Sequence, residues 1–422
     1  MQHKQSVAFH TLGCKLNFSE TSTLSRMVAN EGYENRPFES EADIYVINTC
    51  SVTENADKEC RQIIRRIQKR APSSMVVVTG CYAQLKAKEI GEIPGVDLVL
   101  GAAEKFNLVH HLSLLGNSDT SKVSSCEVNE VNDFQSSFSI DDRTRSFLKI
   151  QDGCDYNCSF CTIPLARGKS RSDRIESICK TAEMLATEGV KEIVLTGINL
   201  GDFGKNIKNE ESEKLIDLFN ALDNISGIKR YRISSIEPNL LTTEIIHFVA
   251  KSKKFMPHFH IPLQSGSDTI LGLMRRRYRK NLYAEKVSEI KSLMPHCAIG
   301  VDVIVGFPGE TEQHFLETVE FISSLDISYL HVFTYSERNH TKALEIEPVV
   351  PVHERNNRNK ILRQLSYDKM THFTNSFSGS TRPVLFEKIQ KNGIMQGYTD
   401  NYIRISTPNR KEWENEIVSW EL

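Results

Sequence analysis

Three cysteines on one short loop are the residues of this 422-residue chain that point most directly to chemistry. Cys154, Cys158 and Cys161 stand in the run C-D-Y-N-C-S-F-C, after a predicted β-strand. Three thiolates at this spacing can hold one 4Fe–4S cluster, and because the cluster has four irons, one iron keeps no protein ligand. An open iron can bind a small molecule, which makes the cluster a reagent. The alternative is structural zinc, but zinc needs a fourth ligand, and the next cysteine is Cys179, in a helical pattern.

A second set of cysteines consists of Cys14, Cys50 and Cys81. Each follows an apolar, β-branched run of strand length and precedes a helical pattern, which predicts successive parallel strands. The carboxyl ends of parallel strands share one edge of a sheet, so we expect these thiols to meet and to hold a second cluster. Two alternatives stay open, namely three unrelated buried cysteines and a structural zinc site.

The elements that position these cysteines predict an α/β protein of three parts. Residues 1–115 are predicted to form an open parallel-sheet α/β domain, and residues 116–141, rich in Ser, Asn and Asp, a linker. Residues 142–367 alternate six apolar strands with helices, which is typical of a partial (β/α)6 barrel with its site at the carboxyl ends of the strands. Residues 368–422 contain short alternating strands, which predict a small antiparallel β-barrel.

Composition narrows the classes of partner and compartment. The formal net charge is −2, so any affinity for RNA must come from local basic patches. The N-terminus has no long apolar region, and no stretch reaches the length of a membrane span, so we expect a cytoplasmic protein with no membrane partner. Ten cysteines in a reducing compartment are expected to be thiols or metal ligands and not disulfides.

Nearly the whole chain resembles the radical S-adenosylmethionine (SAM) methylthiotransferases, and most of all the branch that acts on N6-threonylcarbamoyladenosine in tRNA. The first cysteine set lies in F-H-T-L-G-C-K-L-N, Y-V-I-N-T-C-S-V-T and V-T-G-C-Y-A-Q. The resemblance continues through L-K-I-Q-D-G-C-D-Y-N-C-S-F-C, H-I-P-L-Q-S-G-S and D-V-I-V-G-F-P-G-E-T. The tail, with L-F-E-K-I and Q-G-Y-T-D-N-Y, resembles the RNA-binding TRAM domain of that branch.

The resemblance implies two 4Fe–4S clusters and SAM as cofactors. Cys154, Cys158 and Cys161 would hold the cluster that cleaves SAM, and Cys14, Cys50 and Cys81 an auxiliary cluster that carries the sulfur. The implied product is the 2-methylthio derivative of N6-threonylcarbamoyladenosine, next to the anticodon. The implied partners are the anticodon stem-loop of tRNA and an electron donor such as flavodoxin. A radical route suits adenine C2–H, which is not acidic enough for a side-chain base.

Residues at the other strand ends are candidates for the SAM pocket. Gly197 and Asn199 follow the second barrel strand, where many radical SAM enzymes carry a Gly-Gly-Glu-like sequence that binds the SAM amino group. This chain has T-G-I-N there and lacks the carboxylate. The other candidates are Ser235, Glu237, Gln264, Ser265 and Asp302. For each of them, a loop cap or a turn is the alternative role.

Two basic segments and two aromatic residues are candidates for RNA contact. The basic candidates follow the cluster loop or belong to the densest basic run: Arg167, Lys169, Arg171, Arg275 and Arg276. Binding of the SAM carboxylate is an alternative for the first segment. Tyr398 and Tyr402 are candidate stacking faces in the C-terminal strands, although some of those rings must fill the domain core.

Two other functions compete with this hypothesis. A methylthiotransferase of the same kind could act on N6-isopentenyladenosine in tRNA or on an aspartate of a ribosomal protein. A protein of a different class would be a non-catalytic, redox-sensing RNA-binding iron–sulfur protein, which would not cleave SAM. The open-iron triad and the six-unit barrel favour the enzyme.

Overall fold

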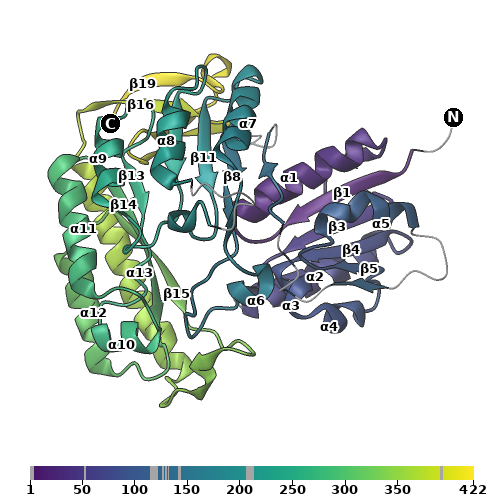
Figure 1. The fold of residues 1–422 in the computed structure, drawn as a ribbon, viewed down its shortest axis with the longest axis horizontal. Helices are drawn as coiled ribbons and strands as arrows, with labels where there is room; N and C mark the ends of the chain where they lie inside the picture. The colour runs from purple at the N-terminus through teal and green to yellow at the C-terminus, as the bar shows by residue number, and fades with distance from the viewer. Residues whose placement is uncertain are drawn as a thin grey trace.

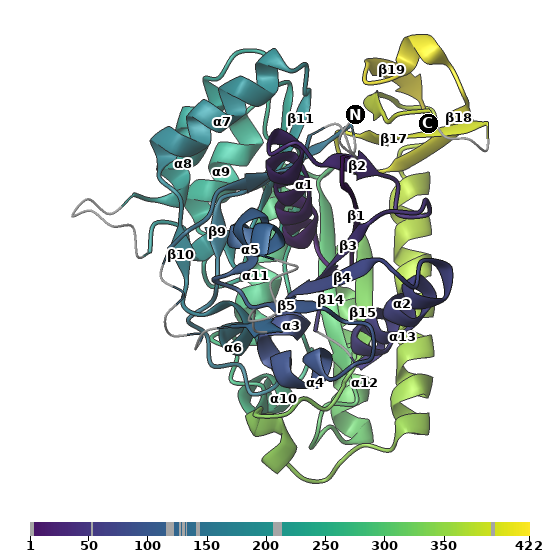
Figure 2. The same cartoon turned by 90° about the vertical axis from the view of Figure 1, so that its right-hand side faces the viewer.

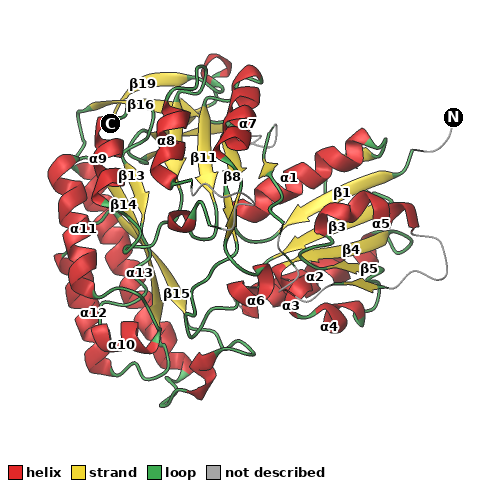
Figure 3. Cartoon of the chain, viewed as in Figure 1, coloured by secondary structure: helices red, strands yellow, loops and turns green. Residues whose placement is uncertain are grey.

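The computed structural model describes residues 4–51, 54–114, 122–125, 128, 131, 133–140, 144–205, 213–389 and 393–422. Figure 1 and Figure 2 show an N-terminal α/β domain beside an incomplete barrel, with an antiparallel sheet packed against one end of the barrel. In Figure 3, helices cover the outside of the barrel strands. The predicted α/β fold class is confirmed.

The N-terminal domain is a six-stranded parallel sheet in the order β2-β1-β3-β4-β5-β6. Its strands are β1 (Ser6–Thr11), β2 (Glu34–Arg36), β3 (Ile44–Thr49), β4 (Met75–Gly80), β5 (Leu98–Leu100) and β6 (Val123–Ser124). Its helices are α1 (Lys15–Asn30), α2 (Glu54–Arg70), α3 (Cys81–Leu85), α4 (Ala87–Gly91) and α5 (Leu108–Leu114). All six residues of β3 are buried, as expected of a strand covered on both faces. The predicted strands before Cys14, Cys50 and Cys81 are the neighbours β1, β3 and β4.

The six strands predicted for the barrel are all present, and they run parallel. They are β8 (Ser146–Lys149), β11 (Glu192–Thr196), β12 (Arg230–Ile233), β13 (His258–His260), β14 (Ala298–Val305) and β15 (Tyr329–Thr334). They form one sheet of order β12-β11-β8-β7, in which β7 (Ser137–Phe138) is antiparallel, and a second of order β13-β14-β15. Parallel bridges from Tyr231 to Phe255 and from Ser235 to His260 join the two sheets into the predicted partial barrel.

The helices of the barrel pack on its outer face and bury one large apolar core with the strands. The long helices are α7 (Ile175–Thr187), α8 (Leu215–Asp223), α9 (Thr243–Lys251), α11 (Lys280–Leu293), α12 (Glu312–Ser324) and α13 (Val352–Asn375). The short elements are α6 (Ile163–Arg167), α10 (Asp268–Leu273), β9 (Gln151–Asp152) and β10 (Arg171–Ser172). Single 3-10 turns occur at η1 (Lys105–Asn107), η3 (Leu200–Asp202), η4 (Lys342–Glu345) and η5 (Lys411–Trp413).

The C-terminal part is an antiparallel sheet of order β18-β17-β16-β19. Its strands are β16 (Thr381–Phe386), β17 (Ile394–Thr399), β18 (Arg404–Pro408) and β19 (Ile417–Glu421). The boundary predicted between residues 367 and 368 falls inside α13, and the first strand of this sheet begins at Thr381.

The predicted linker contributes strands to both neighbouring domains where it is described. Its strand β6 extends the N-terminal sheet beside β5, and its strand β7 pairs with β8 of the barrel. Helix α1 of the N-terminal domain packs on β7 and β8, so the two domains share a packed interface. None of the helices in the described part of the chain combines the length and the apolar composition that a membrane span requires.

Candidate active site between two cysteine triads

The first triad lies on the loop between β9 and α6, at the carboxyl end of the first barrel strand. Gly153 makes the turn into this loop with φ +70°, and a Cβ there would lie 2.0 Å from the carbonyl oxygen of Lys169. The sulfur atoms accept backbone N–H groups, from Tyr156 to Cys154 at 3.4 Å and from Ile163 to Cys161 at 3.5 Å. Burial raises the pKa of Cys154 and Cys161 to about 12, and a bound metal would favour the loss of their protons.

Arg276 contacts the loop of the first cysteine triad, although the sequence analysis suggested that it contacts RNA. Its guanidinium donates to the sulfur of Cys158 at 3.1 Å and pairs with Glu237. The residue is only 9% exposed. Donors to a ligating sulfur tune an iron–sulfur cluster, so Arg276 and Glu237 stand where they can influence the first cluster.

The second triad is assembled by two glycines at the edge of the N-terminal sheet. Gly13 has φ +103°, and a Cβ there would lie 2.6 Å from the Cβ of Cys50. Gly80 has φ +98°, and its Cβ would lie 2.3 Å from the carbonyl oxygen of Thr49. Because both backbones must approach this closely, the chain can place Cys14 and Cys81 beside Cys50 at the ends of adjacent strands.

The three sulfurs of each triad are not as close together as the ligands of a single zinc ion. Zn–S bonds of about 2.3 Å in a tetrahedron hold sulfurs about 3.8 Å apart. Among the described residues, the group whose ligand atoms all lie within 4.8 Å of one another is His260, Asp302 and His331, and neither cysteine triad is so compact. The wider spacing leaves room for a multinuclear centre, and assignment of the six cysteines as its ligands stays a prediction.

Arg167 links the two triads. It ends α6, which follows the first cysteine loop and packs against α3, the helix that begins at Cys81. Its guanidinium donates to Asn17 at 2.6 Å and to Glu20 at 3.1 Å in α1, and to Asp152 at 3.0 Å. It also lies within electrostatic reach of Cys14 and Cys81. The two predicted clusters therefore face one interface between the domains.

Arg167 belongs to a network of six buried charges at this interface. They are Glu20, Asp152, Lys105, Lys149, Arg167 and Arg171. Burial alone would raise the pKa of Glu20, but Arg167, Lys105 and Lys149 outweigh it and lower that pKa. Four cations face two carboxylates, and this positive surplus beside Cys14 and Cys81 is opposite in sign to the charge of ligating thiolates.

Two cavities adjoin the triads. One of about 360 Å³ is lined by the buried charges, Gly80 and Cys81. The other, of about 210 Å³, is lined by Cys161, Gln264, Asp302, Phe333 and neighbours of these residues. A small molecule in the second cavity would lie beside the first triad.

Most of the residues proposed for SAM follow the barrel strands at their carboxyl ends, whereas Asp302 lies within β14, and their environments differ. Asn199 is 2% exposed, and neither atom of its side-chain amide has a partner in the described part of the chain. The side-chain oxygen of Gln264 is likewise buried without a partner among the described residues. Such orphaned polar atoms are what a bound ligand would satisfy.

The other SAM candidates already have roles within the protein. Gly197 packs so closely on Gln151 that a Cβ would lie 2.9 Å from its side-chain oxygen. The carbonyl of Ser235 accepts from Leu200, and the buried hydroxyl of Ser265 lies 3.2 Å from that of Thr318. Glu237 pairs with Arg276, and Asp302 with His260. SAM contact by these residues stays a prediction.

The residues proposed for RNA contact separate into exposed and internal ones. Lys169 and Arg275 are exposed and are free to meet a phosphate, whereas Arg167 and Arg171 are buried in the ion network. Tyr402 stacks on His258 with ring centroids 4.2 Å apart, and Arg145 lies over Tyr398 at 4.4 Å. Both rings are occupied within the protein, so their stacking on bases is a prediction that this geometry does not favour.

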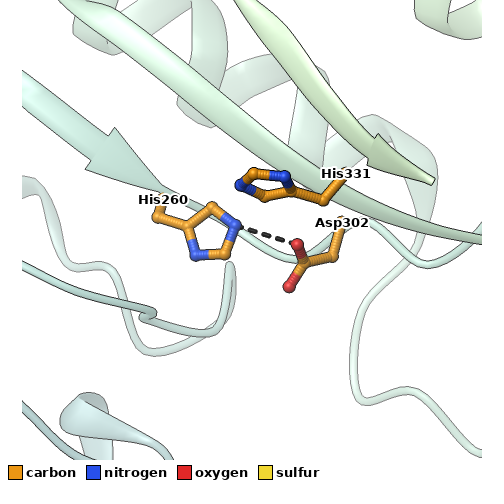
Figure 4. Close-up of side chains that lie close together, drawn as sticks. All are labelled: His260, Asp302 and His331. Carbon is orange, nitrogen blue, oxygen red and sulfur yellow. Dashed lines mark hydrogen bonds and ion pairs between the residues drawn. The ribbon is translucent and has the colours of Figure 1, made fainter. Parts of the chain in front are cut away.

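Sequence reasoning named Asp302 but missed His260 and His331, which form a polar cluster with it inside the barrel, shown in Figure 4. His260 and Asp302 form a hydrogen bond of 2.9 Å, and His331 pairs in register with Asp302 on the neighbouring strand. The signal was present in the alternation of β13 to β15, where apolar residues face the helices and His, Asp and Tyr face inward. Barrel interiors are usually filled by branched apolar side chains, so these polar positions indicate a functional lumen.

The comparisons with known proteins agree with this geometry. A family model described as the radical SAM superfamily matches residues 148–322, and one described as uncharacterized protein family UPF0004 matches residues 6–101. The radical SAM methyltransferase TsrM of Kitasatospora setae has a similar fold, with a TM-score of 0.58 at 14% identity. That match covers 81% of this chain and 74% of TsrM.

Sequence relatives are similar over nearly the whole chain. Threonylcarbamoyladenosine tRNA methylthiotransferase MtaB of Bacillus subtilis is 40% identical, over 99% of this chain and 93% of its own. MtaB of Aquifex aeolicus is 40% identical over 96% of this chain and 97% of its own. A tRNA-2-methylthio-N(6)-dimethylallyladenosine synthase of Clostridium botulinum is 34% identical over 90% of this chain and 86% of its own. This chain therefore belongs to the radical SAM methylthiotransferase family, in the branch of the threonylcarbamoyladenosine tRNA methylthiotransferases.

Proposed function

We propose that this protein is a tRNA methylthiotransferase that converts N6-threonylcarbamoyladenosine, on the 3′ side of the anticodon, to its 2-methylthio derivative. The observation that carries the proposal is the meeting of two cysteine triads at one domain interface, joined through Arg167. Transfer of a methylthio group needs a sulfur source and a means of activating C–H within reach of the same substrate atom. The likeness to MtaB over nearly the whole chain supports this substrate over the isopentenyl one.

The residues of this chain divide the work by position. Cys154, Cys158 and Cys161 would hold the cluster that binds SAM, and Cys14, Cys50 and Cys81 the auxiliary cluster. When bound, the first cluster and SAM supply a radical able to attack a C–H bond that no side-chain base can deprotonate. Asn199 and Gln264 offer unsatisfied polar atoms for the SAM head group, and Arg276 donates to a cluster-ligating sulfur.

Partners follow from the same proposal. Exposed Lys169 and Arg275 are proposed to contact the phosphates of the anticodon stem-loop. A flavodoxin-type protein is proposed as the electron donor, because one electron must reach the first cluster in each cycle. A cytoplasmic location is proposed, since the substrate is tRNA.

The test uses anaerobically reconstituted protein with SAM, a reductant and tRNA that lacks the methylthio group. The RNA is digested and its nucleosides are analysed by mass spectrometry. The expected result is a new nucleoside with the mass of 2-methylthio-N6-threonylcarbamoyladenosine. Cleavage of SAM without any methylthio nucleoside would overturn the assigned tRNA substrate and leave only the radical chemistry.

A further inference from the structure

The lumen of the barrel offers a site for an anionic group. Residues of β13, β14 and β15 alternate, so that Phe259, Val301 and Leu330 join the core under the helices and their neighbours in sequence face the lumen. The inward positions include His260, Asp302 and His331, whose ligand atoms lie within 4.8 Å of one another. His260 and Asp302 are partly buried, and His331 is exposed. Donors at these positions are accessible to a bound molecule.

The N-terminal domain adds a cation to this lumen. Lys15 is the first residue of α1 and directly follows Cys14. Burial lowers the pKa of its ammonium, and Tyr402, Arg145, Arg232 and Asp302 lie within electrostatic range of it. His258 and His331 also experience the charge of Lys15. The side chain thus reaches from the auxiliary triad into the barrel.

Lys15 has no counter-ion of its own in the described residues. Its ammonium makes no ion pair or hydrogen bond there, whereas its cationic neighbours Arg145 and Arg232 both pair with Glu192. Asp302, whose charge reaches this ammonium, is engaged by His260 at 2.9 Å. The arginines near this ammonium already have a carboxylate partner, and the ammonium itself has none. A bound carboxylate would therefore be stabilised next to it.

Residues of this cluster adjoin both predicted cofactor sites. Lys15 is adjacent to Cys14, and Asp302 lines the 210 Å³ cavity together with Cys161. Phe333 lines the same cavity and is 42% exposed, two residues after His331 and on the same face of β15. Consecutive same-face positions on a strand lie about 6.6 Å apart, so a base over Phe333 can extend a substituent toward His331.

The geometry points to Lys15 and His331 as the site that binds the carboxylate of the N6-threonylcarbamoyl group, and so as determinants of substrate choice. This inference rests on the proposed function. An isopentenyl group has no charge and no polar atom, and in this lumen it would leave the ammonium and imidazole unpaired. A site built for a charged group discriminates strongly against an analogue that lacks it, because its own polar groups then lose their partners.

The test measures binding without turnover. The probe is an anticodon stem-loop RNA with one N6-threonylcarbamoyladenosine, either as the free acid or as its methyl ester, titrated with reconstituted protein and SAM but no reductant. The wild type is expected to bind the acid about 10- to 100-fold more tightly than the ester. Lys15→Gln is expected to bind both probes alike, with the affinity of the ester. Lys180→Gln, at an exposed lysine of α7, is the matched control and should behave as the wild type.

Outcomes of this test separate the inference from the proposed function. If Lys15→Gln keeps the preference for the acid, or if the wild type has none while it still methylthiolates the RNA, the inference is overturned alone. If the wild type neither binds nor converts the acid probe, the proposed function fails with it. Because Lys15 adjoins Cys14, iron content is measured in each variant. If Lys15→Gln loses iron, the same titration is made with His331→Ala. A smaller preference for the acid probe is then expected, and an unchanged preference would contradict the inference.

Discussion

Single residues set the geometry of the second triad, and Gly80 shows how. A side chain at Gly80 would be unfavourable for two reasons. The residue has φ +98°, which residues other than glycine rarely adopt, and the new Cβ would lie 2.3 Å from the carbonyl oxygen of Thr49. The collision involves backbone, so β3 and β4 would have to separate at the point where Cys50 and Cys81 must meet. With ψ of −163°, Gly80 lies in a region of backbone conformation that is almost restricted to glycine and that costs a side chain about 1–3 kcal/mol.

We predict that Gly80→Ala loses the auxiliary cluster and keeps the other. Iron in the anaerobically reconstituted protein should fall from about eight to about four atoms per chain. Gly32→Ala is the matched control, because Gly32 has φ +94° but no atom within 4 Å of its added Cβ. That variant should keep all its iron, and equal losses in both would attribute the effect to backbone conformation and not to the collision.

The interface between α1 and the barrel contains buried ion pairs. Glu20, on α1, accepts from Lys105, Lys149 and Arg167, and these cations lower its pKa although burial raises it. A lowered pKa in the folded state means that stabilisation is complete above the ordinary value of 4.5 and is lost as the pH falls. Breaking a buried pair by removing one partner typically costs about 3–5 kcal/mol.

We predict that Glu20→Gln lowers the free energy of unfolding by about 3 kcal/mol at pH 7. Below about pH 5, and increasingly toward pH 2, the stability of the wild type should decline more steeply than that of the variant, which has no carboxylate to protonate. Urea unfolding at several pH values measures both quantities. Glu34→Gln, in the exposed pair with Arg36, is the control and should change neither. Parallel pH profiles of wild type and Glu20→Gln would contradict this account.

At the scale of the whole molecule, arginines of one barrel strand hold the C-terminal sheet. Arg232 donates to the carbonyls of Thr399 at 2.7 Å and Asp400 at 2.9 Å, and Arg230 to that of Tyr398 at 3.0 Å. Both also lie beside the buried Glu192. The loop of the sheet thereby closes one end of the barrel, and Tyr402 reaches the same lumen as Lys15.

We predict that Arg232→Met releases this sheet from the barrel without unfolding the N-terminal domain. Amide hydrogen exchange should accelerate in β17 and β18, because their connecting loop loses its donors, and should remain unchanged in β1, β3 and β4. Arg404→Met replaces an exposed arginine of β18 and serves as the control. Exchange that accelerates equally in all of these strands would indicate global destabilisation and contradict specific docking.

The sequence by itself determined the two cysteine triads, the parallel strands before them and the class of each domain. Those features depend on local patterns: β-branched apolar runs, glycines and cysteine spacing act within a few residues. The sequence did not separate buried charges from exposed ones. An arginine in a basic run has the same kind of neighbours in sequence whether its guanidinium is buried in the fold or exposed to solvent. Arg167, Arg171 and Arg276 therefore looked like phosphate contacts, and only the partners brought by the fold, Glu20, Asp152 and Glu237, placed them inside.

The lumen is the clearest case of a feature that tertiary structure alone decided. Lys15, His260 and His331 lie far apart along the chain, and each has an ordinary role as a helix or strand residue when considered alone. They share a site because β13 and β15 flank β14 and because α1 packs on the open side of the barrel. That docking brings the residue after Cys14 into electrostatic contact with Asp302, and no pattern within either segment encodes this contact.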